Sequence, residues 1–122
     1  MTTIKELSNL KGRRALITGA TGGLGRVIAD SLAELGADLV LVDRPGSDFD
    51  SLSANLTERW GVKVEYQVCD LEQQLQRADL IAWLKSEDQG LNILINNAAF
   101  VGTSDLQGWA VPFEEQTIET WR

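Results

Sequence analysis

Four glycines fall within eight residues near the start of the chain, in the segment Thr18-Gly19-Ala20-Thr21-Gly22-Gly23-Leu24-Gly25. The apolar run before them, residues 13–18, is typical of a short strand, and the apolar side chains after them have helical spacing at Val27, Ile28, Leu32 and Leu35. Glycines let a strand turn tightly into a helix and leave backbone N–H groups facing an anion. The segment therefore predicts a phosphate-binding turn. A tight turn without a ligand is the structural alternative.

Strand and helix patterns alternate after this turn. Residues 37–43 contain a continuous apolar run that is typical of a buried parallel strand, and Gly36 before them is a candidate to end the first helix. A second helix is predicted from the spacing of Phe49, Leu52, Leu56 and Trp60. Ser47 or Asp48 is available to cap its start, and Gly61 to close its end.

Two more strands and a third helix complete the pattern. Alternation of apolar and polar residues over residues 62–68 predicts a strand with one solvent-facing side, near a sheet edge. A helix is predicted over residues 71–87, from Leu75, Ala78, Ile81, Ala82 and Leu84, and a buried strand over residues 91–95. This alternation predicts an α/β fold, a Rossmann-type doubly wound parallel sheet with strand order 3-2-1-4.

The last part of the chain has a different pattern. Periodicity is lost over residues 100–113, which are predicted to form a loop, and residues 114–122 are predicted to start another helix, inside which the chain ends. A complete doubly wound fold needs two βαβαβ halves. We therefore expect residues 1–122 to be the N-terminal part of a single NAD(P)-binding Rossmann domain, with the second half missing.

Composition disfavours several classes of protein. The 18 Asp and Glu residues exceed the 11 Lys and Arg residues, and the net charge of −7 argues against a nucleic-acid partner. No apolar run approaches the roughly 20 residues that span a bilayer, so no membrane partner is expected. The chain has no His and a lone cysteine, Cys69, so no metal site is predicted. Cys69 cannot form an internal disulfide and no signal-peptide pattern is present, which indicates a cytoplasmic protein.

Asp43 ends the second predicted strand, 18 positions after Gly25. This spacing is close to the offset of about 20 residues at which a carboxylate meets the adenosine ribose in dinucleotide-binding folds. Asp43 therefore favours NAD over NADP, because a carboxylate repels a 2′-phosphate. Arg44 beside it could instead pair with that phosphate, so NADP stays open. A solvated aspartate at a strand end is the structural alternative.

Three motifs together resemble the short-chain dehydrogenase/reductase family over essentially the whole chain. They are the glycine segment, Asp70-Leu71 after the third strand, and Asn96-Asn97-Ala98-Ala99 after the fourth. The glycines fit both the short, single-domain branch and the longer branch that contains nucleotide-sugar epimerases. The Asn-Asn-Ala-Ala turn favours the short branch, from whose Asn-Asn-Ala-Gly pattern it departs only at Ala99.

The resemblance and the glycine turn together imply a set of cofactor-binding residues. By resemblance, Asp70 accepts from the adenine amino group, Leu71 adds a backbone contact, and the turn after the fourth strand stabilises the sheet and contacts the cofactor. A helix N-cap is the structural alternative for Asp70. The predicted cofactor-binding residues are Gly19, Thr21, Gly22, Gly23, Leu24, Gly25, Asp43, Arg44, Asp70, Leu71, Asn97, Ala98 and Ala99.

The family's catalytic Tyr-x-x-x-Lys motif is not found in these residues. The sole tyrosine, Tyr66, lies in a predicted strand and is followed four positions later by Asp70, so no catalytic residue is predicted. We expect the full-length protein to be an NAD(P)-dependent oxidoreductase of small-molecule alcohols or carbonyls and a homo-oligomer, with this chain alone inactive. A nucleotide-sugar epimerase or dehydratase and a non-catalytic dinucleotide-binding module are the alternatives.

Overall fold

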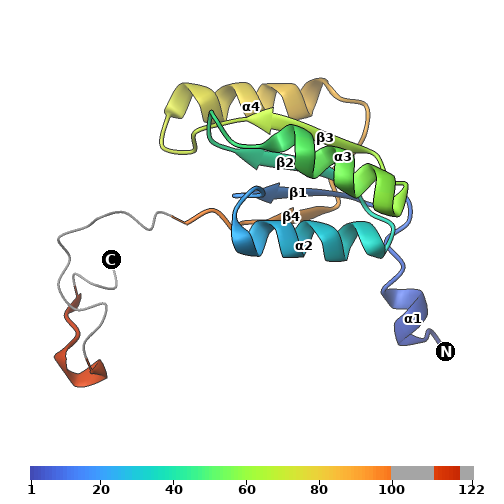
Figure 1. The fold of residues 1–122 in the computed structure, drawn as a ribbon, viewed down its shortest axis with the longest axis horizontal. Coiled ribbons are helices and arrows are strands. Elements are labelled where there is room, and N and C mark those ends of the chain that lie inside the picture. The colour runs from blue at the N-terminus through green and yellow to red at the C-terminus, as the bar shows by residue number, and fades with distance from the viewer. Residues whose placement is uncertain (100–111, 119–122) are drawn as a thin grey trace.

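The computed structural model of the chain describes residues 1–99 and 112–118. Within these residues it has one sheet of four parallel strands in the order β3-β2-β1-β4, which Figure 1 shows side by side. The strand bounds are β1 Arg14–Thr18, β2 Asp38–Asp43, β3 Val64–Val68 and β4 Ile93–Ile95. The strand order confirms the predicted Rossmann-type α/β architecture.

Helices connect the strands. Asp48 caps the start of α3, where its carboxylate accepts from the Ser51 N–H at 3.3 Å, and Gly61 ends it in a left-handed conformation at φ 69°, as predicted. Gly36, also as predicted, follows the end of α2 at φ 100°. The helix bounds are α1 Ile4–Leu7, α2 Gly23–Glu34, α3 Phe49–Trp60, α4 Gln74–Ser86 and the 3-10 helix η1 Phe113–Glu115.

Helices α2 and α3 cover one face of the sheet and form the larger core. Small side chains, Ala29 and Ala33, are buried on α2 and let the helix lie close to the strands. Val27 and Leu35, which share the helical spacing, are 62% and 41% exposed, so the apolar face predicted for α2 was too wide. This core is made of Ala15, Ile17, Ala20, Ala29, Ala33, Ala37, Leu39, Leu41, Phe49, Leu52, Leu56 and Val62.

Helix α4 covers the other face with Leu80, Trp83 and Leu84, which pack over Leu16, Val40, Val42 and Cys69. The predicted start at residue 71 was wrong, because Asp70 and the next residues form a turn before the helix. The apolar side chains from which this helix was predicted are also not all buried, since Leu75 and Ile81 are 80% and 51% exposed. Apolar residues occur on two sides of α4, so spacing alone could not identify the buried side.

The two outer strands are less buried than predicted. β4 is shorter than the predicted strand over residues 91–95, and Leu94 is 55% exposed although Ile93 and Ile95 pack against the larger core. The prediction that β4 is buried was therefore wrong for one face, since Leu94 is not among the residues that pack under α4. β3 lies at the sheet edge as predicted, but its apolar side is only partly covered, and Val68 is 51% exposed.

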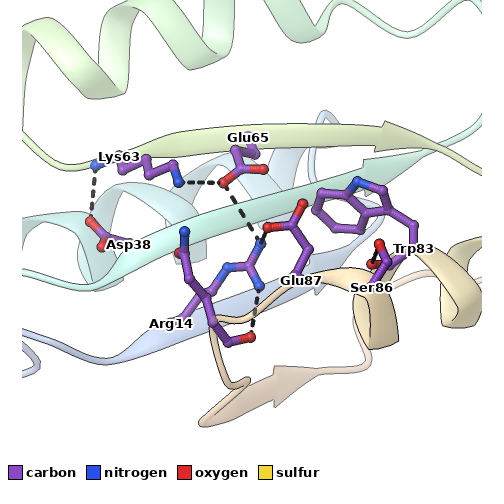
Figure 2. Close-up of polar contacts among 8 residues, drawn as sticks. Arg14, Asp38, Lys63, Glu65, Trp83, Ser86 and Glu87 are labelled. Carbon is purple, nitrogen blue, oxygen red and sulfur yellow. Dashed lines mark hydrogen bonds and ion pairs between the residues drawn. The ribbon is translucent and has the colours of Figure 1, made fainter.

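A network of charges joins β1, β3 and α4 at the amino ends of the strands (Figure 2). The Arg14 side chain is buried, and its Nη2 atom lies 3.7 Å from a Glu65 oxygen and 4.0 Å from a Glu87 oxygen. Lys63 also pairs with Glu65 at 3.0 Å, and the Trp83 ring lies 5.5 Å from the guanidinium carbon. These contacts explain why Glu65 is half-buried, although it lies on the side of β3 that was predicted to face solvent.

The last segment of the chain is described only in part. The predicted loop over residues 100–113 lies mostly outside the described residues, as do residues 119–122 of the helix predicted from residue 114. Within residues 112–118 the structure has η1, and Gln116 after it is extended, so the expected α-helix does not begin at residue 114. No helix among the described residues is long and apolar enough to cross a membrane.

Candidate functional site

The turn between β1 and α2 depends on two glycines. Gly19 has a left-handed φ of 64°, and a Cβ there would lie 3.0 Å from the Cα of Ala98. A Cβ on Gly25 would lie 2.8 Å from the Cα of Ala20 and would also meet the Gly19 carbonyl oxygen. Gly19 is needed for its backbone conformation and Gly25 for the close packing of α2 on the turn. The structure confirms the predicted tight turn.

Helix α2 begins at this turn without a side-chain cap. Its N-cap residue is Gly22, whose carbonyl accepts the first helical hydrogen bond from the Arg26 N–H at 3.0 Å. The N–H groups of Gly23, Leu24 and Gly25 precede that bond and have no acceptor within the helix. A Cβ on Gly23 would meet nothing within 4 Å, so the backbone here borders open space. The start of α2 is therefore suited to an anion.

Asp43 ends β2 and is bonded to the same turn. Its Oδ2 atom accepts two hydrogen bonds from Thr21, one from the backbone N–H at 3.0 Å and one from the hydroxyl at 2.6 Å. Its Oδ1 atom accepts a third from the Arg44 N–H at 2.8 Å. These bonds fix the orientation of a carboxylate that is only partly buried.

The same bonds control the pKa of Asp43. Partial burial by itself raises the pKa of this carboxyl group, but hydrogen bonds from the Thr21 hydroxyl and from the Arg44 and Thr21 N–H groups outweigh the burial, helped by the Arg44 charge. The pKa of Asp43 therefore lies below its ordinary value of 3.8. At neutral pH the end of β2 carries a full negative charge.

Asp70 follows β3 at the same edge of the sheet. Its Oδ1 atom accepts from the Glu72 N–H at 3.0 Å, and its own N–H donates to the Gln76 side chain at 2.7 Å. The N-cap of α4 is Gln73, so the alternative that Asp70 caps this helix is wrong. Asp70 instead closes a turn before the helix. The carbonyl of Leu71 in that turn accepts from the Arg77 guanidinium at 2.6 Å.

The segment after β4 is tied to the end of β1. The Thr18 hydroxyl oxygen accepts from the N–H groups of Asn97 and Ala98 at 3.1 and 3.0 Å. The Asn97 amide donates in turn to the carbonyls of Thr18 and Gly19, both at 3.2 Å. Asn97 thus has the stabilising role in the sheet that was expected of it. Its contact with a cofactor stays a prediction.

A cavity of about 540 Å³ opens where these segments meet. Parallel strands bring their carboxyl ends to one edge of a sheet, which is why motifs far apart in the sequence converge there. Every residue predicted to contact a cofactor lines this cavity: Gly19, Thr21, Gly22, Gly23, Leu24, Gly25, Asp43, Arg44, Asp70, Leu71, Asn97, Ala98 and Ala99. Four more residues line it that were not predicted: Val42, Ser47, Cys69 and Glu72.

Comparison with known proteins agrees with this geometry. Residues 13–122, nearly the whole chain, match the family model for short chain dehydrogenases. The chain belongs to the short-chain dehydrogenase family. A relative in this family, a tropinone reductase homolog from Datura stramonium, is 40% identical over 94 residues, which cover 74% of this chain and 34% of that protein.

Two solved structures of short-chain dehydrogenases have the same fold. L-sorbose reductase from Gluconobacter frateurii, complexed with NADPH and L-sorbose, superposes with a TM-score of 0.71 at 30% identity, over 93% of this chain and 41% of that one. A short-chain dehydrogenase from Sphingobium yanoikuyae in complex with NADPH gives 0.68 at 36% identity, over 88% and 39%. The chain thus spans about a third to two-fifths of the length of these relatives.

Three of the four lining residues that the prediction missed, Val42, Cys69 and Glu72, are sequence neighbours of residues that it found. Cys69 is buried in the core under α4, and it also borders the cavity beside Asp70. Burial and the neighbouring Asp70 charge raise the pKa of this thiol. Ser47 lies in the turn after β2, where its N–H donates to the Arg44 carbonyl at 3.3 Å. Proximity to the strand-end aspartates is the signal that could have identified both.

Tyr66 does not line the cavity. Its hydroxyl donates to Asp50 on α3 at 3.0 Å, and its ring stacks on Phe49 with centroids 4.7 Å apart. The hydrogen bond to Asp50 and the charge of that carboxylate raise the pKa of the phenol. Tyr66 therefore has no acid–base role at the cavity.

Proposed function

We propose that the chain binds a nicotinamide adenine dinucleotide, NAD(H) in preference to NADP(H), as the cofactor-holding part of an oxidoreductase that interconverts alcohols and carbonyls. The observation that carries the proposal is the fixed, charged carboxylate of Asp43 beside the uncapped start of α2. Such a carboxylate suits ribose hydroxyls, and such a helix start suits a pyrophosphate. The NADPH complexes of the two solved relatives support the class of cofactor.

Each part of the dinucleotide would have a partner in the cavity. We assign the pyrophosphate to the N–H groups at the start of α2 and the adenosine ribose to Asp43. The adenine is assigned to the turn at Asp70 and Leu71, where the carboxylate uses only Oδ1 among the described residues and keeps Oδ2 for an amino group. The nicotinamide would then lie near Ala98 and Ala99. When bound, the nicotinamide supplies or accepts the hydride, and the chain orients it.

Charge at the ribose end favours NAD(H). Three of the described lining residues are acidic, Asp43, Asp70 and Glu72, and only Arg44 is basic. A 2′-phosphate beside Asp43 would place two negative groups in contact. Arg44 is exposed, so water and salt would weaken its attraction for that phosphate. We therefore propose that repulsion by Asp43 outweighs attraction by Arg44.

The described lining residues are suited to binding a cofactor, and none of them is placed to act as an acid or base. Exchange of a hydride with an alcohol also transfers a proton, which needs an acid or base at the reacting carbon. The carboxylates that line the cavity belong to the adenosine end, and the Cys69 thiol is buried with a raised pKa. We therefore propose that the chain by itself binds the dinucleotide without turning over a substrate.

Calorimetric titration of the full chain with NAD⁺ and with NADP⁺ tests the proposal. We expect NAD⁺ to bind about tenfold more tightly, and Asp43→Ala to remove this preference, because the repulsion of the 2′-phosphate and the hydrogen bond to the ribose disappear together. Asp88→Ala is the matched control, since Asp88 is an exposed carboxylate outside the cavity. Tighter binding of NADP⁺ by the unchanged chain, or equal preferences in the chain and its Asp43→Ala variant, would contradict the proposal.

A further inference from the structure

Thr21 directs both of its hydrogen-bond donors at one atom. The hydroxyl, at 2.6 Å, and the backbone N–H, at 3.0 Å, both reach Oδ2 of Asp43. The short O–H···O⁻ distance is that of a strong, charge-assisted bond. Two donors of the glycine turn, which borders the cavity, are therefore committed to a carboxylate of the chain itself.

The carboxylate of Asp43 has few acceptor positions left. A carboxylate offers about four lone-pair positions, two on each oxygen. Thr21 occupies both positions on Oδ2, and the Arg44 N–H occupies one on Oδ1 at 2.8 Å. One position on Oδ1 remains for a ligand. The oxygen of the Thr21 hydroxyl, whose proton points at Asp43, keeps its own acceptor capacity.

The turn that carries Thr21 is itself held in place. The Arg26 Nε atom, in the first turn of α2, donates to the Thr21 carbonyl at 2.8 Å. Arg26 thus fixes the peptide that follows Thr21, while Asp43 fixes the peptide that precedes it. Thr21 is bonded on both sides before any ligand arrives.

We infer that Thr21 is a positioning residue that sets the choice between NAD(H) and NADP(H) through Asp43. It fixes the carboxylate with one acceptor aimed at a ribose hydroxyl, and it withholds from a 2′-phosphate the two donors that this phosphate would need. The inference rests on the proposed function, because it concerns the same cavity and the same cofactor. Asp43, at the end of β2, then discriminates fully between NAD(H) and NADP(H) only when the hydroxyl of Thr21 holds its carboxylate in place.

Three substitutions test this inference on the full chain. Thr21→Val keeps the shape of the side chain and removes the hydroxyl, whereas Thr21→Ser keeps the hydroxyl. Thr57→Val is the matched control, because Thr57 is exposed on α3 outside the cavity. The measurement is calorimetric titration with NAD⁺ and with NADP⁺, read as the ratio of the two dissociation constants. If Thr21→Val does not fold, which a thermal melt would show, Thr21→Ala replaces it.

Thr21→Val should reduce the preference for NAD⁺ about tenfold, which is the effect of losing one hydrogen bond to a charged group. Thr21→Ser and Thr57→Val should keep the ratio within about twofold of the unchanged chain. A ratio left intact in Thr21→Val, or raised because Asp43 then takes both ribose hydroxyls, would overturn the inference while leaving the proposed function standing. Failure of the unchanged chain to bind NAD⁺ would instead refute the proposed function, and the inference with it.

Discussion

Strand β1 has polar groups at both ends, and the two ends use them differently. At the amino end, Arg14 is only 5% exposed and its guanidinium lies between the carboxylates of Glu65 and Glu87. At the carboxyl end, the chain enters the glycine turn, where the first N–H groups of α2 have no acceptor in the helix. The amino end neutralises its own charges, whereas the carboxyl end keeps hydrogen-bonding capacity for a ligand.

The comparison shows that polar residues at a sheet edge do not by themselves indicate a site. The Arg14 network is made of charged side chains, yet these charges serve to hold β3 and the end of α4 against β1. Asp43 takes part in a similar set of internal bonds but still keeps one acceptor position and borders open space. The buried Nη2 atom of Arg14 also lacks a hydrogen-bond partner among the described residues, so the open cavity beside the unused groups is what separates the binding end from the structural end.

The largest effect on stability and on NAD⁺ binding is expected from a substitution in the glycine turn, at the carboxyl end of β1. Gly25→Ala places a Cβ against Ala20 and the Gly19 carbonyl, so the turn or α2 must move. We expect the free energy of unfolding to fall by about 3 kcal/mol, as in other overpacked sites, and NAD⁺ binding to be lost. Urea unfolding monitored by circular dichroism measures the first effect, and calorimetry the second.

Gly23→Ala is the matched control for this substitution. Its Cβ would meet no atom within 4 Å, so the stability of the chain should not fall. If a cofactor lies against the start of α2, the same Cβ should still weaken NAD⁺ binding. Equal losses of stability in the two variants would show that glycine at position 25 has no special packing role.

A smaller effect is expected at the amino end. Arg14→Met removes the positive charge that pairs with Glu65 and Glu87, while Glu65 keeps its pair with Lys63. We expect a loss of about 2 kcal/mol in the free energy of unfolding, less than for a fully buried pair because both carboxylates keep about a quarter of their side-chain surface in water. The ratio of NAD⁺ to NADP⁺ affinity should not change, because the network lies at the far end of the sheet.

Lys63→Met is the control substitution with which the stability of Arg14→Met is compared. The Lys63 side chain is half exposed, so its pair with Glu65 should contribute less than about 1 kcal/mol. The stabilities of both variants are measured by urea unfolding. If Arg14→Met changed the ratio of NAD⁺ to NADP⁺ affinity, the distinction between a structural end and a binding end of the sheet would be wrong.

The arrangement of strands could be predicted because two strong patterns coincide. The glycines of the turn fix one strand-to-helix junction, and the continuous apolar run of β2 identifies a central strand. The site followed from the fold, since parallel strands place Asp43, Asp70 and Asn97 at one edge.

The details of α4 and β3 could not be predicted from spacing. Helix α4 carries Leu75 and Ile81 on one side and Leu80 and Trp83 on another, and only the position of the sheet selects the buried pair. On β3, Glu65 is half-buried by an arginine 51 positions earlier in the chain, a contact between residues far apart in sequence. Alternation of apolar and polar residues carries no information on such a partner.

The bond between Thr21 and Asp43 was also beyond the sequence. Both residues were predicted to contact a cofactor, but 22 positions separate them and nothing in their pattern indicates that they contact each other. The bond depends on how tightly the turn brings the chain back over the end of β2. The sequence therefore identified the members of the site and not the way in which they act on one another.

Amide NMR spectra of the isotope-labelled chain, recorded during titration with NAD⁺, test most directly whether the carboxyl end of β1 binds and the amino end does not. We expect the largest shift changes at Gly23, Leu24 and Gly25 and at Arg44, whose N–H groups lie at the cavity. The amides of Arg14 and the other residues of its network should stay unchanged. Unchanged signals at the start of α2, or equal changes at both ends of the sheet, would contradict the account.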